Sequence, residues 1–324
     1  MTKSMIVKLG LVLSLVLLAG SAFAEYPDHT IHMIVPYPAG GSTDVAARIV
    51  SENMSKQLGV PIIIENRPGA SGFIGAGAVA RSEPDGYRLL FAGSGISSGP
   101  SLKEVTFDLR KDLTPISKVV SSQFSILVNP KKFNLKTLQE FLDYARANPG
   151  KVSMACSGAM TAAHFALEAF RQKAGLDFVT IQYSGNAPAQ TAMMVGEPPA
   201  GIDAAFSAKE AVNAGLLRAL AVTGSKRSPQ MPDVPTAAEA GVPGYEGGFS
   251  LVMLAPGGTP KPIIDRIYKA VSSAMNDKAL VERLQATGYE PVGNTPEEYA
   301  AQLEIEIQQS AKIIESLRAA GVVQ

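Results

Sequence analysis

The chain contains no tryptophan, one cysteine and three histidines among its 324 residues. A single cysteine, Cys156, excludes an internal disulfide bond, and it stands too far from the amino terminus for a lipoprotein start. Histidine, cysteine and acidic residues nowhere show the spacing of a metal-binding motif. We therefore predict that the protein holds no metal.

The chain also lacks an excess of charge of either sign. It carries 29 basic and 29 acidic residues, and two of the basic ones, Lys3 and Lys8, lie in the first 24 residues, which contain no acid. The remainder has a net charge of −2. This balance argues against a nucleic-acid surface or a basic membrane patch, so we expect no nucleic-acid partner.

Only the amino terminus has a long apolar run. Residues 9–19 follow two lysines, and the run is too short for an ordinary membrane span. The Ala-Phe-Ala of residues 22–24 has the form of a cleavage site. We read residues 1–24 as a signal peptide cleaved after Ala24, the alternative being an uncleaved anchor. A lone thiol in an exported chain of this kind fits the periplasm.

One stretch organises the rest of the chain, the loop at residues 35–44 (VPYPAGGSTD). It comes after an apolar run typical of a buried strand and precedes a helical pattern. The first amides of a helix have no partners inside the helix, and its dipole leaves partial positive charge there. Gly40 and Gly41 let a ligand approach the backbone closely. The loop is thus either an anion site or an ordinary capped turn.

Strand and helix patterns alternate along the chain, which is typical of a sheet with helices on both faces. Short apolar or β-branched runs occur at residues 61–65, 87–92, 112–119 and 124–129. A second strand-to-helix turn lies at residues 157–161, so the chain repeats its opening geometry in a second half. About 300 residues suffice for two such domains.

Three strings suggest other chemistry. Residues 95–99 match G-x-S-x-G, but the Gly-Pro at 99–100 prevents the helix that this hydrolase motif requires. Cys156 stands near a helix start, which could lower the pKa of its thiol. The glycines at 72, 75 and 77 are not in the order of a dinucleotide site, so we expect no cofactor. An exported hydrolase or thiol enzyme using Ser97 or Cys156 with His164 remains an alternative, and a ligand-facing loop at 93–100 is the preferred interpretation.

Several motifs together resemble one family over nearly all of the chain after residue 24. The resembling segments are YP at 26–27, VPYPAGGSTD at 35–44, ENRPGA at 65–70, PDGY at 84–87, LRALAVT at 217–223 and PDVPTAAEAG at 232–241. Their number, order and spacing resemble the substrate-binding proteins of tripartite tricarboxylate transporters, the Bug or TctC-type family.

The resemblance implies an α/β fold, namely a two-domain periplasmic binding protein of the Venus flytrap, type II-like class with a parallel-dominated sheet in each domain. The implied division is residues 25–124 for the first part of domain 1, 125–245 for domain 2, and 246–324 for the return to domain 1. We expect hinge closure about residues 123–127 and 245–250, where the chain crosses between the domains.

The resemblance also implies that loop amides and ordered waters hold a ligand carboxylate. The predicted ligand-binding residues are Tyr37, Ala39, Gly40, Gly41, Ser42, Thr43, Asp44, Ser94, Ser157, Gly158, Met160, Thr161, His164 and Asp203. Two departures affect the domain 2 wall, because Met160 stands where the family usually has glycine and Pro198-Pro199 replaces a usual Val-Asp pair. Asp203 either faces the far end of the ligand or only caps the following helix.

The implied function is capture of a small organic acid for the inner-membrane permease of a tripartite tricarboxylate transporter, by a protein that is a monomer and not an enzyme. A carboxylate-sensing co-receptor for a membrane regulator shares the same fold and is a second interpretation. The identity of the acid does not follow from the sequence.

Overall fold

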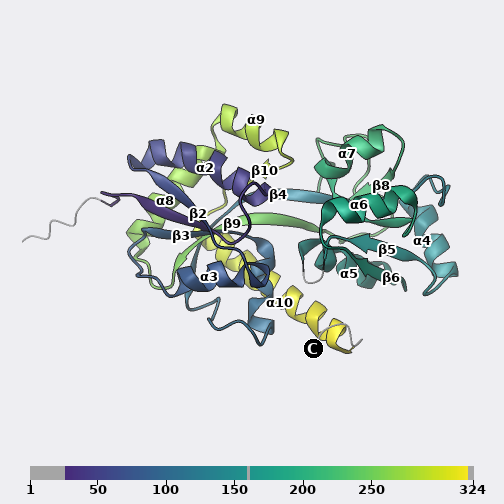
Figure 1. The fold of residues 1–324 in the computed structure, drawn as a ribbon, viewed down its shortest axis with the longest axis horizontal. Coiled ribbons are helices and arrows are strands. Elements are labelled where there is room, and N and C mark those ends of the chain that lie inside the picture. Colours follow the sequence, from purple (N-terminus) through teal and green to yellow (C-terminus); the bar gives the residue numbers. More distant parts are fainter. Residues whose placement is uncertain (1–25, 159–160, 320–324) are drawn as a thin grey trace, which may run out of the picture.

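The computed structural model describes residues 26–158 and 161–319. The predicted signal peptide and its cleavage site lie outside the described residues. Two lobes lie side by side along the longest axis and are joined by extended strands (Figure 1). Within the described residues, the strands are β1 (Ile31–Val35), β2 (Ile62–Asn66), β3 (Arg88–Gly93), β4 (Leu113–Val128), β5 (Ser153–Cys156), β6 (Val179–Gln182), β7 (Ala200–Ala204), β8 (Arg218–Val222), β9 (Gly248–Pro256) and β10 (Glu290–Pro291).

These strands form one mixed sheet in the order β2-β1-β3-β9-β4-β7-β5-β6, with β10 and β8 also paired to β4. Pairs are parallel among β1, β2 and β3 and among β5, β6 and β7. Every pair that includes β4 or β9 is antiparallel. Parallel pairing therefore characterises the outer part of each lobe, while the crossing strands make the centre antiparallel.

Helices cover both faces of the sheet in each lobe (Figure 1). They are α2 (Ser42–Leu58), α3 (Phe73–Ala80), α4 (Leu138–Ala147), α5 (Ala162–Ala174), α6 (Asn186–Val195), α7 (Ala205–Asn213), α8 (Lys261–Met275), α9 (Lys278–Ala286) and α10 (Pro296–Ala319), with 3-10 turns η1 (Ala70–Gly72) and η2 (Ser94–Ser101). In domain 1, α2, α8 and α9 pack on one face and α3 and α10 on the other. In domain 2, α4 and α5 lie opposite α6 and α7.

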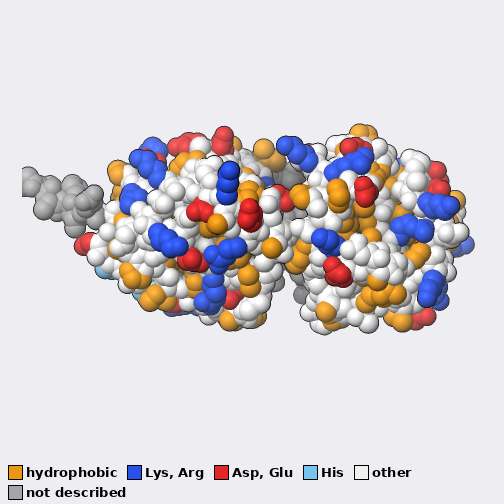
Figure 2. All heavy atoms as spheres, turned by 90° about the horizontal axis from the view of Figure 1, so that it is seen from above, with side chains coloured by type: hydrophobic (Ala, Val, Ile, Leu, Met, Phe, Trp, Pro, Cys, Tyr) orange, Lys and Arg blue, Asp and Glu red, His pale blue; other side chains and the backbone are white. Residues whose placement is uncertain are grey.

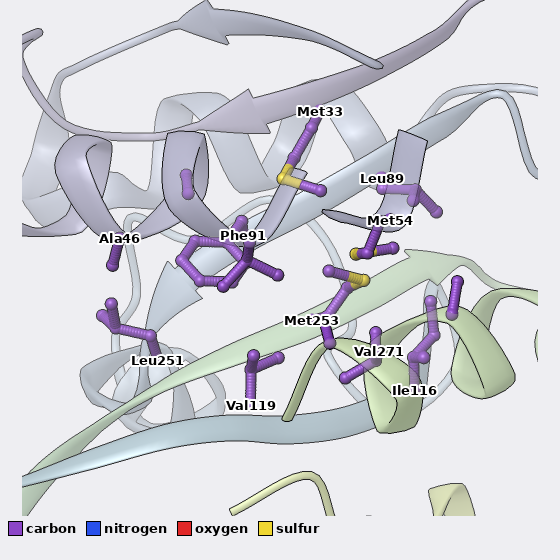
Figure 3. Close-up of a cluster of buried hydrophobic side chains, with 14 of the residues drawn as sticks. Met33, Ala46, Met54, Leu89, Phe91, Ile116, Val119, Leu251, Met253 and Val271 are labelled. Atoms are coloured by element: carbon purple, nitrogen blue, oxygen red, sulfur yellow. The ribbon is translucent and has the colours of Figure 1, made fainter. Parts of the chain in front are cut away.

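The largest core of domain 1 lies between α2, α8 and the sheet. Met33 of β1, Met54 of α2 and Met253 of β9 are all fully buried in it. Figure 3 shows these methionines and Phe91 extending into the space between the helices and the strands. Flexible thioether side chains fill irregular gaps, which suits a layer where curved strands meet two helices.

The strands predicted at 112–119 and 124–129 form one strand, β4, so their predicted separation was wrong. The residues between them stay in the strand because they have partners there. Ser121 pairs with Glu290 of β10, and the Ser122 hydroxyl donates to the Gly288 carbonyl at 2.8 Å. The first part of β4 pairs with β9, and residues 124–128 pair with β7 and β8. A single strand therefore belongs to both lobes, and the residue ranges given above for the two domains stay a prediction.

Thr223 joins the two places where the chain crosses between the lobes. Its hydroxyl accepts from the Phe124 amide of β4 at 2.9 Å and donates to the Gly247 carbonyl just before β9. Its backbone carbonyl accepts from the Gly247 amide at 2.8 Å. The side chain is fully buried, so no water replaces these bonds.

We predict that Thr223→Val lowers the free energy of unfolding by about 1–3 kcal/mol, because the Phe124 amide loses its hydroxyl partner in a buried site. The matched variant Thr223→Ser keeps the hydroxyl and loses less. Urea denaturation of the three proteins checks this. Equal stability of Thr223→Val and wild type would contradict the role of the hydroxyl.

Candidate functional site

The loop between β1 and α2 is exposed at residues 38–42, directly before a helix start. Gly40 adopts a φ of +79°, and Gly41 caps α2 in extended geometry without any side-chain hydrogen bond. The helical bonding begins with the Val45 amide, which donates to the Gly41 carbonyl at 3.0 Å. The first-turn amides of Ser42 and Thr43 thus have no partners inside the helix, and Ser42 is exposed.

Asp44 is buried beneath this loop, with 3% of its surface exposed. Its carboxylate accepts from the Gly40 amide at 2.9 Å, from the Arg48 guanidinium at 2.9 and 3.0 Å, and from the Asn66 amide nitrogen at 3.0 Å. Burial by itself raises the pKa of this carboxyl, but the hydrogen bonds outweigh it and lower the pKa to about 2. Asp44 therefore fixes the shape of the loop from below.

Two further bonds hold the base of the loop. Asn66 donates to the Tyr37 carbonyl at 3.1 Å, and the Tyr37 hydroxyl accepts from the Gly93 amide at 3.3 Å. The residue after Gly93, Ser94, accepts from the Ser250 amide of β9 at 3.1 Å. The carboxyl ends of β1 and β3 are thereby tied to each other and to the beginning of β9.

The start of α5 repeats part of this arrangement in domain 2. Thr161 caps the helix by accepting from the His164 amide at 3.2 Å, and it donates to the Gly158 carbonyl at 3.0 Å. Gly158 has a φ of +115°, and Ser157 and Thr161 are half-buried. Met160 lies outside the described residues.

His164 is inside domain 2 with 1% of its surface exposed. Its Nε2 atom lies 3.3 Å from the Gln182 amide nitrogen and 3.9 Å from the Glu168 carboxylate. Burial lowers the pKa of this imidazole, against the pull of Glu168. The structure thus places His164 behind the α5 start rather than on an exposed wall.

Asp203 is also buried, at the carboxyl end of β7. Its carboxylate accepts from the Ala204 amide at 2.8 Å and from the Gln190 side chain at 3.1 Å. Burial raises the pKa of Asp203 to about 7, although both hydrogen bonds act in the opposite direction. The amide of Ala204 belongs to the N-cap residue of α7 and not to its first turn, so this bond is not the helix cap that the sequence allowed.

A groove separates the lobes in the space-filling view, with basic and acidic side chains interspersed on both (Figure 2). A cavity of about 800 Å³ lies against the crossing strands. Its walls come from both domains and include Ser94, Gln123, Phe165, Thr223, Phe249 and Glu306. Among the described residues of the predicted site, only Ser94 lines this cavity.

Neither arginine near the first loop is unpaired. Arg48 is held by Asp44, and the Arg67 guanidinium lies 2.7 Å from the Glu65 carboxylate. Among the described residues, no group of three or more histidine, cysteine, aspartate or glutamate side chains could hold a metal ion. The polar features that this loop offers an anion are amides and hydroxyls.

The residues of the enzyme alternative are not arranged for catalysis. Cys156 is fully buried, and burial raises the pKa of its thiol to about 11, contrary to the expected lowering at a helix start. Ser97 is buried in η2, where its hydroxyl lies 3.0 Å from that of Ser310. The segment predicted as a ligand-facing loop at 93–100 is mostly this 3-10 turn.

A family model described as the tripartite tricarboxylate transporter family receptor, TctC, matches residues 46–318. The chain belongs to this family. The receptor is 36% identical to protein BugT of Bordetella pertussis over 295 residues, which cover 89% of each chain. The resemblance seen in the sequence motifs is therefore confirmed.

Solved structures agree with the fold of this receptor. A Rhodopseudomonas palustris protein, Rpa4515, solved with adipate, is 30% identical with a TM-score of 0.75 and covers 92% of the receptor and 99% of its own chain. MatC from the same organism, solved with malate, is 31% identical with a TM-score of 0.72. The match covers 89% of the receptor and 100% of the MatC chain. The predicted two-domain binding-protein fold is confirmed, and the hydrolase alternative is not favoured in a family of receptors.

Arg48 of α2 and Asn66 of β2 hold the receptor's loop through Asp44, although neither was among the predicted site residues. An acid and an arginine four residues apart on a helix form a recognisable pair, so the spacing of Asp44 and Arg48 carried a usable signal. Asn66 lay in one of the family motifs, but its partners, Tyr37 and Asp44, lie far away in the sequence and became visible only in the fold.

Between residues 26 and 319, with the short gap at 159–160, no helix has the length and apolar character needed to cross a membrane.

We predict that Asp44→Asn lowers the free energy of unfolding by about 1–2 kcal/mol at pH 7. The carboxyl has a lower pKa in the folded receptor than in an unfolded chain. Its stabilisation is therefore complete above about pH 4 and is lost as the pH falls through about 2. Denaturation curves between pH 2.5 and pH 7 check this.

Glu52→Gln is the matched control, because Glu52 also pairs with basic side chains but is exposed. A surface pair of this kind contributes about 0–1 kcal/mol. A stability difference for Asp44→Asn that does not shrink toward low pH would contradict the prediction.

Proposed function

We propose that this receptor is a periplasmic protein that binds a small organic acid between its two lobes and presents it to an inner-membrane permease of a tripartite tricarboxylate transporter. Family membership supports the receptor role. Two similar structures contain adipate and malate, which supports a carboxylate as the ligand. The observation that carries the proposal is the exposed, uncapped start of α2 on a loop braced from below.

One carboxylate of the ligand docks on residues 39–42 in this proposal, and the start of α5 at residues 157–161 approaches it from domain 2. Amides at a helix start are oriented before the ligand arrives, so binding loses little rotamer entropy. Bridging waters reposition while keeping their hydrogen bonds, so one site accepts acids of different shape. In this proposal Asp44 and His164 support the two helix starts from behind and do not contact the ligand, which their burial supports.

The sensing co-receptor shares this binding site and differs only in the membrane partner. A pull-down of inner-membrane proteins with and without ligand separates the two roles. Recovery of permease subunits supports transport, and recovery of a membrane regulator alone would contradict it. We propose that the receptor acts as a monomer after removal of residues 1–24.

We predict that Gly41→Val weakens carboxylate binding at least ~10-fold while leaving the fold intact. Gly41 has a φ of −72°, which any residue adopts, and an added Cβ would lie 3.3 Å from the Pro38 carbonyl oxygen. The valine side chain then occupies the space beside the first-turn amides. Thermal-shift and calorimetric titration with a panel of organic acids measure the loss.

The control for this variant is Arg67→Ala. Arg48 is the arginine closest to the loop in the sequence, and Arg67 is the next closest. The affinity of Arg67→Ala stays within about twofold of wild type if amides and hydroxyls carry recognition. A ligand at one hundred times its dissociation constant stabilises the folded receptor by about 2.7 kcal/mol, so binding is readily detected. Loss of binding in Arg67→Ala with normal binding in Gly41→Val would establish an ion pair instead.

Asp203 gives the proposed site a pH dependence. Its pKa of about 7 means that the carboxyl is mostly neutral at pH 6 and mostly ionised at pH 8. An ionised Asp203 repels a bound carboxylate but accepts from a ligand hydroxyl or amine. We predict that affinity for a simple dicarboxylate falls as the pH rises from 6 to 8, and that Asp203→Asn removes this dependence.

Calorimetric titration at several pH values in that range measures the effect. The counterpart is Asp44→Asn, whose carboxyl is already ionised throughout this range and whose loss leaves the slope unchanged. A wild-type affinity that does not vary with pH would mean that Asp203 does not act on the ligand.

A further inference from the structure

The two lobes also touch away from the crossing strands, at the end of α9. Residues 285–288, which we call the α9 turn, belong to domain 1, because Leu284 and Tyr289 on either side of them are buried in the same core as α2. The start of α7, in domain 2, lies against this turn. Figure 1 shows α7 and α9 on the same side of the strands that join the lobes.

The contact consists of one aromatic ring and one hydrogen bond. A Cβ added to Gly288 would overlap the ring of Phe206, so this ring occupies the place of a side chain on Gly288. The Gln230 side chain of domain 2 donates to the Gln285 carbonyl at 2.9 Å, and the Gly288 amide donates to the same carbonyl at 3.0 Å. The ring and the hydrogen bond therefore meet the same short turn.

The α9 turn is held firmly within domain 1. The Gly288 carbonyl accepts from the Ser122 hydroxyl of β4 at 2.8 Å. At the other end of α9, the Asn53 side chain of α2 donates to the Asp277 carboxylate at 3.1 Å. Because α9 and α2 also share one core, the turn moves together with α2, whose start is the proposed carboxylate site.

The domain 2 side of the contact is tied to the other half of the proposed site. Phe206 stands three residues after Asp203, which lies at the carboxyl end of β7. The Gln190 side chain donates to the Asp203 carboxylate at 3.1 Å and to the Ser207 carbonyl at 3.0 Å. One amide thus fixes Asp203 and the first turn of α7 together, so Phe206 moves with this wall of the site.

The contact lies on the side of the hinge where the proposed site stands. Tyr289, directly after the α9 turn, shares its core with Tyr37 of the first loop, and Phe206 follows the strand end that carries Asp203. Lobes that close on a ligand between these strand ends also bring Phe206 toward Gly288. Lobes that part separate the two residues.

We propose that the seating of Phe206 on Gly288 is a latch between the lobes, which forms as they close on a carboxylate and slows its release. The inference rests on the proposed function, because the latch acts on the same site. Phe206, Gln230 and Gly288 are all half-buried, and each lobe keeps its own core. A contact of this size separates without unfolding either lobe, and it biases the equilibrium between open and closed forms.

The first test is Phe206→Ala, which removes the ring from the contact. Surface plasmon resonance measures the association and release of malate, adipate and the other acids of the panel. We expect release to become ~5- to 20-fold faster with little change in association, since the latch forms after the acid has entered. Release as slow as that of wild type would overturn the inference.

Gly288→Ala disrupts the latch from domain 1, because the added Cβ displaces the Phe206 ring. Its matched control is Gly258→Ala, between β9 and α8. The φ angles of the two glycines are +83° and +81°, but an added Cβ on Gly258 has no atom within 4 Å. Both variants carry the strain of alanine at positive φ, so both lose stability. Only Gly288→Ala should release the acid faster, and equal release from both variants would overturn the inference.

A double-mutant cycle separates the latch from independent effects on each lobe. If Phe206 and Gly288 act through one contact, Gly288→Ala speeds release no further in the Phe206→Ala background, where the added methyl group has room. Additive effects would overturn the inference. If Phe206→Ala does not fold, the comparison of Gly288→Ala with Gly258→Ala decides alone. Failure of wild type to bind any of the acids would overturn the proposed function and the latch with it, whereas normal binding with unchanged release in the variants would overturn the latch alone.

Discussion

The antiparallel pairing of β4 with β9 is the constraint on which both lobes depend. Each strand runs through the centre of the sheet, and β4 continues from partners in domain 1 to partners in domain 2. Thr223 bonds to both crossings from within the second lobe. Two paired extended strands resist shear but still bend and twist, and such a connection permits rigid lobes to move about a few residues. In the described part of the chain, β4 leads from domain 1 into domain 2 and β9 leads back, and these strands lie against the cavity between the lobes.

The charge of Asp44 holds the first loop in shape from below. The Asp44 carboxylate accepts hydrogen bonds from the Gly40 amide, Arg48 and Asn66. These bonds tie the loop to both α2 and β2. A negative charge at a helix start is favourable, and here it lies below the exposed surface. Arg48 is neutralised in the same contact. The outer face of the loop is left with oriented amides and hydroxyls, the groups that the proposed function assigns to the ligand carboxylate.

The aromatic row from Tyr289 through Phe249 to Phe124 connects these two features. It begins at Tyr289, which packs in the same core cluster as α2, and ends at Phe124, where β4 enters domain 2. The core beneath α2 is thereby packed against the crossing strands.

The sequence by itself determined the fold class, the family and the two helix-start loops, because these depend on local patterns. Apolar runs, glycine turns and cap residues act over a few residues, and β1, α2 and α5 lie where the patterns predicted. Only the tertiary structure decided that β4 is continuous and that Asp44 and His164 are buried. These outcomes depend on partners far away in the chain: Glu290 and Gly288 for β4, Asn66 for Asp44, Gln182 for His164. A local pattern shows that a residue is polar or capping, but burial is decided by what packs over it.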